Sequence, residues 1–420
     1  MLFRNVTLAD GRTRDVRTDG ETIAAVGEEL TAAGDAIDGT GKRLFPGMID
    51  AHVHFREPGH PHKETWATGS KSAAAGGVTT VFDQPNTDPP TVDAAGYERK
   101  ADRAAESLVD YGINGGVTDA WSPEELLEQP IAALGEIFLA DSTGEMGIGA
   151  ERYEAALRRV RSRSIPVTVH AEDATRFDDS VTDRADSDAW SAYRTADAEI
   201  EAIRRACDTA RDVGTDVHIA HTSTPRGADA AREAGMTCEA TPHHLFLSRD
   251  DLDELGTFGR MNPPLRSERR REGLFRRLVD GRIDIVATDH APHSREEKAT
   301  DIWSAPSGVP GVETALALLL EAARTGAIGY ERVRDLTAAN VADRFGLETK
   351  GRIEPGYDAD LVLFDPEDST PIRGSELHTK CDWTPFEGHR GVFPEVTMAG
   401  GTVVFREGEF GERTGRNVRV

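Results

Sequence analysis

The most informative segment of this chain reads Asp50-Ala51-His52-Val53-His54-Phe55-Arg56-Glu57-Pro58-Gly59. Residues two apart on a β-strand point to the same face, so His52 and His54 are expected to project together from a strand end. Imidazole nitrogen is a ligand that suits zinc. The pair alone is weak evidence, because solvated His-x-His pairs are common. We interpret His60 and His62, which follow Pro58-Gly59 in a predicted loop, as surface residues.

Outward from this segment, the chain alternates between short β-rich runs and helical stretches. The helical stretch 196–213, for example, places Ile200, Ile203 and Cys207 at intervals of three and four. Eight β-rich runs are found at 44–55, 78–86, 109–117, 135–140, 165–173, 216–223, 236–245 and 283–293. Eight alternating units predict an α/β fold of the (β/α)8 TIM-barrel type.

Three other predicted strands also end in metal-ligand residues. The fifth ends at His170, the sixth at His221 and the eighth at Asp289. The C-terminal ends of barrel strands converge on one mouth. We therefore predict one site formed by His52, His54, His170, His221 and Asp289. Strand alternation does not separate His218 from His221; we place His221, at the strand terminus, in the site, and His218 in the core or behind the ligands.

The two ends of the chain differ from its middle. Short strand-like runs with turns occur at 2–8, 22–26 and 35–38, and again at 360–364, 395–398 and 402–405. We predict a small β-sandwich built from residues 1–43 and 352–420, which flanks a barrel of residues 44–351. Such boundaries are defined only to within several residues.

The composition narrows the class of protein. The 420 residues carry 49 Lys+Arg and 74 Asp+Glu, a net charge of −25, which argues against binding to nucleic acid or an anionic membrane. No apolar run approaches a membrane span, and the start lacks the pattern of a secretory signal. Three separated cysteines suit a reducing cytoplasm. The dispersed acidic charge is typical of a halophilic surface, with an ordinary acidic surface as the alternative.

The sequence resembles the dihydroorotases of the amidohydrolase superfamily over essentially its whole length. Besides 50–59, the resemblance is carried by Gln84-Pro85-Asn86-Thr87, Val169-His170-Ala171-Glu172, Ala220-His221, Asn262-Pro263-Pro264-Leu265-Arg266, Thr288-Asp289-His290-Ala291-Pro292-His293 and 307–314. It implies a metal-dependent barrel with a terminal β-sandwich. It also implies interconversion of N-carbamoyl-L-aspartate and L-dihydroorotate, a step of pyrimidine synthesis.

The resemblance further implies a role for each matching residue. Two zinc ions are expected per subunit, one on His52 and His54 and the other on His170 and His221. Asp289 is expected to contact the first metal and to act as general acid/base. The substrate is expected to lie against His54, Arg56, Asn86, Asn262, His293, Ser307 and Gly308. Among these, Arg56, Asn86 and His293 would hold its free carboxylate, which a guanidinium recognises through two parallel hydrogen bonds.

The chain departs from the family on the fourth strand. Most superfamily members bridge the two metals there with a carboxylated lysine, but this chain reads Leu134-Gly135-Glu136-Ile137-Phe138-Leu139-Ala140-Asp141. Glu136 aligns with the lysine and can bridge two zinc ions with its own two oxygens, although it is shorter. Asp141 is the alternative bridge, because some dihydroorotases use an aspartate near this point. A site without a protein bridge is the third interpretation. We favour Glu136.

Two other functions stay open at this stage. Allantoinases and hydantoinase-like cyclic amidases share the histidines but generally differ at the position of Arg56, because their substrates lack this carboxylate. An inactive homologue that scaffolds aspartate transcarbamoylase is the third hypothesis, although such proteins usually lose metal ligands. The expected oligomer is a homodimer.

Overall fold

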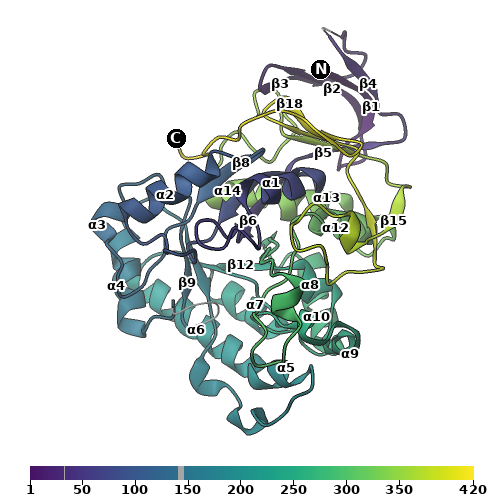
Figure 1. The fold of residues 1–420 in the computed structure, drawn as a ribbon. Helices are drawn as coiled ribbons and strands as arrows, with labels where there is room; N and C mark the ends of the chain where they lie inside the picture. The colour runs from purple at the N-terminus through teal and green to yellow at the C-terminus, as the bar shows by residue number, and fades with distance from the viewer. Residues whose placement is uncertain (33, 141–145) are drawn as a thin grey trace.

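The computed structural model describes residues 1–32, 34–140 and 146–420. At its centre lies a ring of parallel strands (Figure 1). Its members are β6 (Met48–Val53), β7 (Val78–Asp83), β8 (Asp110–Ile113), β9 (Leu134–Phe138), β10 (Val167–His170), β11 (His218–Ile219), β12 (Thr237–Ala240) and β13 (Ile285–Val286). Parallel bridges from Gly115 to Leu134 and from Val53 to His290 close the ring. The predicted (β/α)8 barrel is confirmed.

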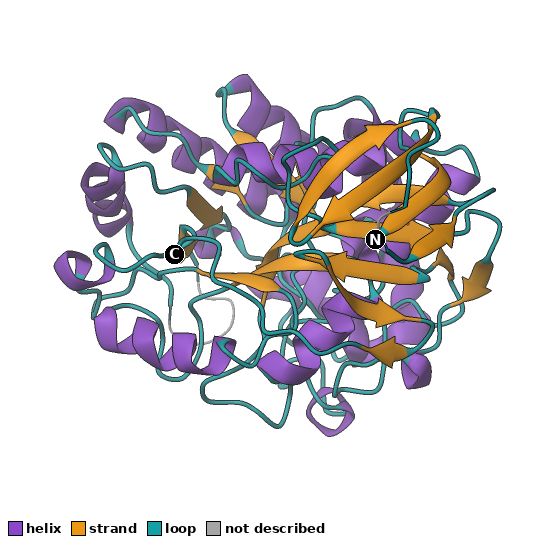
Figure 2. Ribbon diagram, turned by 90° about the horizontal axis from the view of Figure 1, so that it is seen from above, coloured by secondary structure: helices purple, strands orange, loops and turns teal. Residues whose placement is uncertain are grey.

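Helices surround these strands, as seen from above in Figure 2. They are α1 (Trp66–Ala75), α2 (Ala94–Ala104), α3 (Pro123–Leu126), α4 (Ala150–Val160), α5 (Ala189–Tyr193), α6 (Ala196–Val213), α7 (Pro225–Glu233), α8 (Pro242–Phe246), α9 (Leu252–Leu255), α10 (Glu268–Val279), α11 (Arg295–Lys298), α12 (Ala315–Arg324), α13 (Tyr330–Arg334) and α14 (Asn340–Phe345). Helix α6 has the predicted bounds, with Thr195 capping its start and Gly214, at φ 76°, ending it. No helix in the described ranges is long and apolar enough to cross a membrane.

Both chain ends contribute to one further sheet. Its nine strands within the described residues are β1 (Leu2–Thr7), β2 (Thr13–Asp19), β3 (Thr22–Gly27), β4 (Ala36–Asp38), β5 (Arg43–Pro46), β14 (Leu361–Phe364), β17 (Val396–Ala399), β18 (Thr402–Arg406) and β19 (Glu409–Phe410). The antiparallel pairing of β5 with β14 joins the N-terminal to the C-terminal strands. Phe3, Val16 and Met398 are fully buried in its own apolar core.

The run 44–55, predicted as one strand, is two strands in the structure. β5 belongs to the sheet of the chain ends, and β6 begins the barrel after Gly47. A Cβ atom at Gly47 would lie 2.2 Å from the Thr79 hydroxyl oxygen, so only glycine allows the two segments to approach this closely. The strand that carries the first histidine pair therefore begins directly after the point where the chain passes from the sheet of the chain ends into the barrel.

Several contacts hold the sheet of the chain ends to the barrel. The buried ammonium of Lys350 donates to Asp110 of β8 at 2.8 Å and to Asp360, next to β14, at 2.6 Å. The last residues of the chain return to the barrel, where the Val418 amide donates to the Tyr111 carbonyl. β15 (Ser369–Pro371) and β16 (Arg390–Val392) form a two-stranded antiparallel sheet, and β16 packs on α12. The sheet of the chain ends is thus joined to the barrel by buried ion pairs and by backbone hydrogen bonds.

Candidate active site

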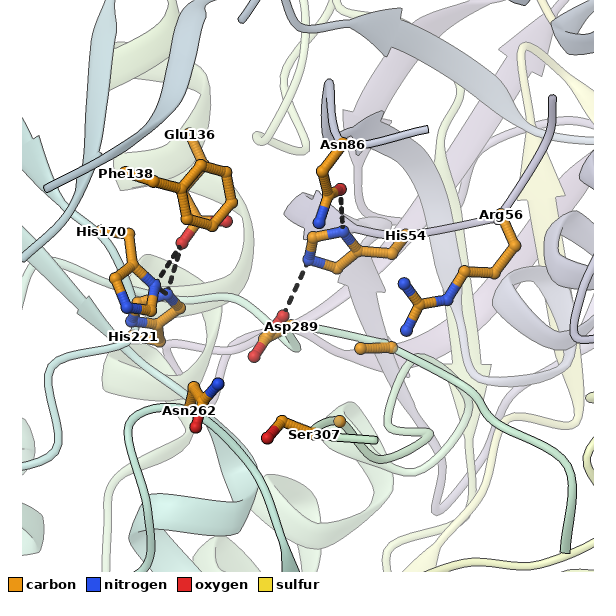
Figure 3. Close-up of a pocket in the computed structure, with 12 residues that line it drawn as sticks. His54, Arg56, Asn86, Glu136, Phe138, His170, His221, Asn262, Asp289 and Ser307 are labelled. Carbon is orange, nitrogen blue, oxygen red and sulfur yellow. Dashed lines mark hydrogen bonds and ion pairs between the residues drawn. The ribbon is translucent and has the colours of Figure 1, made fainter. Parts of the chain in front are cut away.

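Strand ends bring the predicted ligands together at the mouth of the barrel (Figure 3). These residues are His52 in β6, His54 just after it, Glu136 in β9, His170 at the end of β10, His221 after β11 and Asp289 after β13. Each is 7% exposed or less. A cavity lies at their centre and is also lined by Arg56, Asn86, Phe138, Asn262, Ala291, Ser307 and Gly308. His52 and His293 lie behind this lining.

Glu136 faces both histidine pairs. Its Oε1 lies 3.0 Å from His170 Nδ1 and 2.5 Å from His221 Nε2, and its Oε2 lies 3.2 Å from His52 Nε2. Two groups of possible metal ligands result, His52–His54–Glu136 and Glu136–His170–His221, and Glu136 belongs to both. Asp141, the alternative bridge, lies outside the described residues.

The chemistry of these donors fits a two-metal centre. His52 Nε2 is buried and faces Glu136 at 3.2 Å, but it makes no well-oriented hydrogen bond within the described chain, as expected of a nitrogen that serves a metal. Three histidines direct their other nitrogen to an acceptor: His52 Nδ1 to Glu239 at 2.7 Å, His54 Nδ1 to Asn86 at 2.7 Å and His170 Nε2 to Glu172 at 2.9 Å. Such outer contacts fix the tautomer and the orientation of a metal-binding imidazole.

Two of these outer acids did not emerge as functional residues from the sequence. Glu239 lies inside β12 and also accepts from His218 Nε2 at 3.1 Å, which places His218 behind the ligands. Glu172 is paired with the buried Arg194. One feature of the sequence could have indicated a role for Glu239. It is a charged residue inside a buried strand, and such a residue is rarely buried without a partner.

Gln84 is a further residue whose role the sequence did not indicate. Its Oε1 accepts from the Glu136 amide at 2.9 Å and from Asn114 Nδ2 at 3.1 Å. Its Nε2 donates to the Ala51 carbonyl at 3.1 Å. This one side chain therefore ties the backbone of β6 to that of β9 and fixes where Glu136 leaves its strand.

Asp289 lines the cavity beside the first histidine pair. Its Oδ1 is 3.0 Å from His54 Nε2 and 3.6 Å from His52 Nε2. Burial alone would raise the pKa of Asp289, but the hydrogen bond with His54 and the charge of His52 hold it below its ordinary value. The backbone at Asp289 has a φ of 48°, and Arg56 and His221 also have positive φ. Strained backbone of this kind is concentrated at functional sites.

Arg56 and Asn86 form a polar corner on one side of the cavity. Arg56 is 5% exposed, its Nε donates to the Pro292 carbonyl at 3.2 Å, and burial lowers its pKa to about 10. It forms no ion pair with an acid of the described residues, although its guanidinium points into the cavity (Figure 3). Asn86 accepts from His54 through Oδ1, so its amide NH2 group is directed away from the imidazole.

Asn262, Ser307 and Gly308 form the opposite wall. Trp190 Nε1 donates to Asn262 Oδ1 at 2.9 Å. The Ser307 hydroxyl is buried and has no hydrogen-bond partner within the described ranges. The Gly308 amide already donates to the Arg260 carbonyl at 3.0 Å, so this segment presents the Ser307 side chain as its available donor. His293 lies against Arg56 and Ser307 rather than in the cavity lining.

Fold and site together define a barrel hydrolase with its polar centre at the C-terminal ends of the strands. The chain belongs to the amidohydrolase family, whose sequence model matches residues 43–404. It is 62% identical over 419 residues to a dihydroorotase of Halobacterium salinarum, with 100% of this chain and 99% of that protein covered. Identity to a dihydroorotase of Methanosarcina mazei is 42%, with 94% and 91% covered.

Solved structures show the same architecture. An L-hydantoinase (dihydropyrimidinase) from Arthrobacter aurescens superposes with a TM-score of 0.92 at 26% identity, with 98% of this chain and 97% of that chain covered. The resemblance inferred from the sequence motifs is confirmed at the level of the family and of the fold.

Proposed function

We propose that this chain is a dihydroorotase, which interconverts N-carbamoyl-L-aspartate and L-dihydroorotate by closing and opening a cyclic amide in pyrimidine synthesis. The observation that carries the proposal is the buried guanidinium of Arg56, which has no acidic partner in the described chain and faces the cavity beside the histidine cluster. A substrate carboxylate would supply the missing negative charge. The identity to named dihydroorotases over the whole chain supports the same activity.

We propose two zinc ions per subunit. His52 and His54 would hold one, His170 and His221 the other, and Glu136 would bridge them. Zinc bound here would supply Lewis-acid activation of water and of the amide carbonyl. Charges of His52 and His221 overcome the opposing effect of burial and hold the pKa of Glu136 well below its ordinary value, so the bridge is ionised as a ligand must be.

The chain's own residues would then bind the substrate and move one proton. Arg56 and Asn86 line the subsite for the free carboxylate, and His293, which was expected to share in it, contacts Arg56 from behind. Asn262 and the Ser307–Gly308 segment contact the ring, which His54 also borders. Asp289, ionised at neutral pH, accepts a proton from the water whose oxygen adds to the amide carbonyl, and passes that proton to the ring nitrogen as the C–N bond breaks. Cyclisation follows the same path in reverse.

The proposal also covers the domain boundaries, the location and the oligomeric state of the enzyme. Residues 1–43 and 352–420 form a domain separate from the barrel of 44–351. The sheet of this domain extends to Pro46, the last residue of β5. The enzyme acts in the cytoplasm as a homodimer. The net charge of −25 supports a halophilic surface.

The test is a turnover assay in molar KCl with added zinc. It presents L-dihydroorotate, allantoin and a simple hydantoin in parallel, before and after chelation. We expect chelator-sensitive turnover of dihydroorotate alone. Turnover of allantoin or hydantoin instead would overturn the assignment of Arg56. Bound zinc without turnover of any substrate would favour a scaffold, which binding to aspartate transcarbamoylase would then test.

A further inference from the structure

A lysine that has no part in the proposed mechanism stands directly behind the carboxylate subsite. The Lys63 ammonium lies 3.1 Å from Nδ1 of His293, and its side chain is 13% exposed. Glu297 holds it there at 3.0 Å. On the other side of the imidazole, His293 Nε2 lies 2.9 Å from the Ser307 carbonyl oxygen and 3.1 Å from Arg56 Nη2.

These neighbours make incompatible demands on Nε2. The Ser307 carbonyl can only accept, so it requires a proton on Nε2. Arg56 Nη2 can only donate, so a hydrogen bond to it requires a lone pair on Nε2. A neutral imidazole carries one proton and therefore satisfies one of the two contacts, depending on its tautomer.

Lys63 decides between the tautomers. A charged ammonium has donors and no acceptor, so His293 Nδ1 must present its lone pair to Lys63. The single proton of His293 then lies on Nε2 and goes to the Ser307 carbonyl. Arg56 Nη2 is left without that acceptor and keeps its N–H groups for a ligand in the cavity.

The electrostatic surroundings support a neutral imidazole. Burial, together with the charges of Arg56, Lys63 and Lys298, holds the pKa of His293 well below its ordinary value. The acid that faces it, Glu297 of α11, lies 3.9 Å from Nδ1, further away than the lysine. The tautomer, and not a change of protonation, is therefore the variable that this arrangement controls.

We propose that Lys63 is a positioning residue for substrate recognition: it fixes the proton of His293 on Nε2, so that Ser307 takes that proton and Arg56 stays available for the substrate's carboxylate. The effect on substrate binding rests on the proposed function, whereas the tautomer of His293 does not depend on any substrate. Without Lys63, His293 is free to carry its proton on Nδ1 and to accept from Arg56, which withdraws a donor from the carboxylate.

The first experiment observes the tautomer directly. Imidazole ¹⁵N spectra of the zinc-loaded, histidine-labelled protein are recorded, with the His293 signals assigned from their loss in His293→Asn. We expect a lone pair on Nδ1 and a proton on Nε2 in the unsubstituted protein, and a shift toward the other tautomer in Lys63→Met. A proton on Nδ1 in the unsubstituted protein would overturn the proposal.

The second experiment measures steady-state kinetics with L-dihydroorotate. Lys63→Met is expected to raise KM about tenfold, the value of one charge-assisted hydrogen bond, with kcat nearly unchanged. Lys63→Arg should restore KM, and Glu297→Gln, which frees the lysine, should raise KM less. Lys71→Met removes the same charge from an exposed position on α1 and is the matched control.

The outcomes separate the two proposals. Equal KM values for Lys63→Met and Lys71→Met, or a fall in kcat without a change in KM, would overturn the positioning role. Absence of dihydroorotate turnover in the unsubstituted, zinc-loaded protein would instead reject the proposed function, and the ¹⁵N spectra would still decide the tautomer.

Discussion

Replacing Arg56 by methionine tests the central proposal most sharply. Arg56 is 5% exposed, and its guanidinium faces the cavity and has no acidic partner among the described residues. Burial of a cation without a counter-charge is unfavourable, and here a substrate carboxylate would compensate for it. Methionine is shorter than arginine, but it replaces the unbranched apolar stem and removes the charge. The substitution should therefore affect binding of the carboxylate and leave the fold intact.

The size of the effect follows from the contacts that are lost. Arg56 Nε is already engaged with the Pro292 carbonyl, which leaves the two terminal amino groups for the substrate. Each hydrogen bond to a charged group is worth about 1.5–3 kcal/mol, so two give about 3–6 kcal/mol. That corresponds to a loss of about 10²–10⁴ in kcat/KM for dihydroorotate. Arg56→Lys, which keeps the charge but not the paired donors, should lose less.

The assay combines kcat/KM for dihydroorotate with zinc content and thermal unfolding of the same preparations. We expect unchanged zinc content and an unfolding temperature that does not fall. A loss of less than about tenfold would be smaller than a single charge-assisted hydrogen bond and would refute the assignment of Arg56 to the carboxylate. A loss of zinc together with activity would also refute it, because the effect would then arise at the metal centre.

Four further predictions concern the metal centre, acid stability and salt. Glu136→Ala should lower zinc per chain from two toward one or none, measured by elemental analysis after dialysis, because its two oxygens face different histidine pairs. Glu239→Gln should weaken zinc about 10–100-fold in a chelator competition, because Glu239 orients His52. Although burial works in the opposite direction, the Ser294 amide and Lys63 lower the pKa of Glu297 to about 2, so its stabilising contribution is present above pH 4.5 and is lost as pH falls toward 2. The free energy of unfolding, measured with denaturant, should therefore fall less in Glu297→Gln than in the unsubstituted protein as pH drops through that window. The expected difference is about 1–2 kcal/mol after allowance for partial exposure. The thermal midpoint should rise from low to molar KCl, because salt screens a net charge of −25.

Each of these predictions has an opposing result. Full zinc occupancy in Glu136→Ala would transfer the bridge to another residue. Unaltered zinc affinity in Glu239→Gln would show that His52 needs no outer acceptor. Parallel pH curves for Glu297→Gln and the unsubstituted protein would show that this carboxylate titrates alike in the folded and unfolded chains. A thermal midpoint independent of KCl would reject the halophilic interpretation.

The barrel could be predicted from the sequence because its strands are short apolar runs at regular intervals. Each of the seven runs after 44–55 overlaps one barrel strand, although the end of the run 236–245 lies in helix α8. The prediction of a single strand over 44–55 was wrong because the hydrophobic residues continue from β5 into β6. The change of sheet depends on the close approach of Gly47 to Thr79, a contact between segments distant in the sequence. β2 was missed because its residues, Thr13–Asp19, are mostly polar, and its place in the sheet depends on its pairing with β1 and β3.

The candidate site was likewise predictable only in part. Ligands such as His52 and His170 were predictable because a strand of period two and a common barrel mouth bring them together. The residues behind them were not predictable in role, because Glu239 meets His52 across 187 positions of sequence and Gln84 meets Glu136 across 52. Strand alternation specifies which face a residue takes, but not which distant side chain it meets there.

Glu136 shows why this outer layer matters. A glutamate is shorter than a carboxylated lysine, so bridging by Glu136 requires a backbone that stands close to both histidine pairs. Gln84 supplies that constraint, because it binds the Glu136 amide and the Ala51 carbonyl at once. With the backbone of β9 held in this way, the two carboxylate oxygens reach His52 on one side and His221 on the other. The shorter bridge is therefore compensated by the position of the strand that carries it, and a centre built on Glu136 would need no carbon dioxide to complete its ligand.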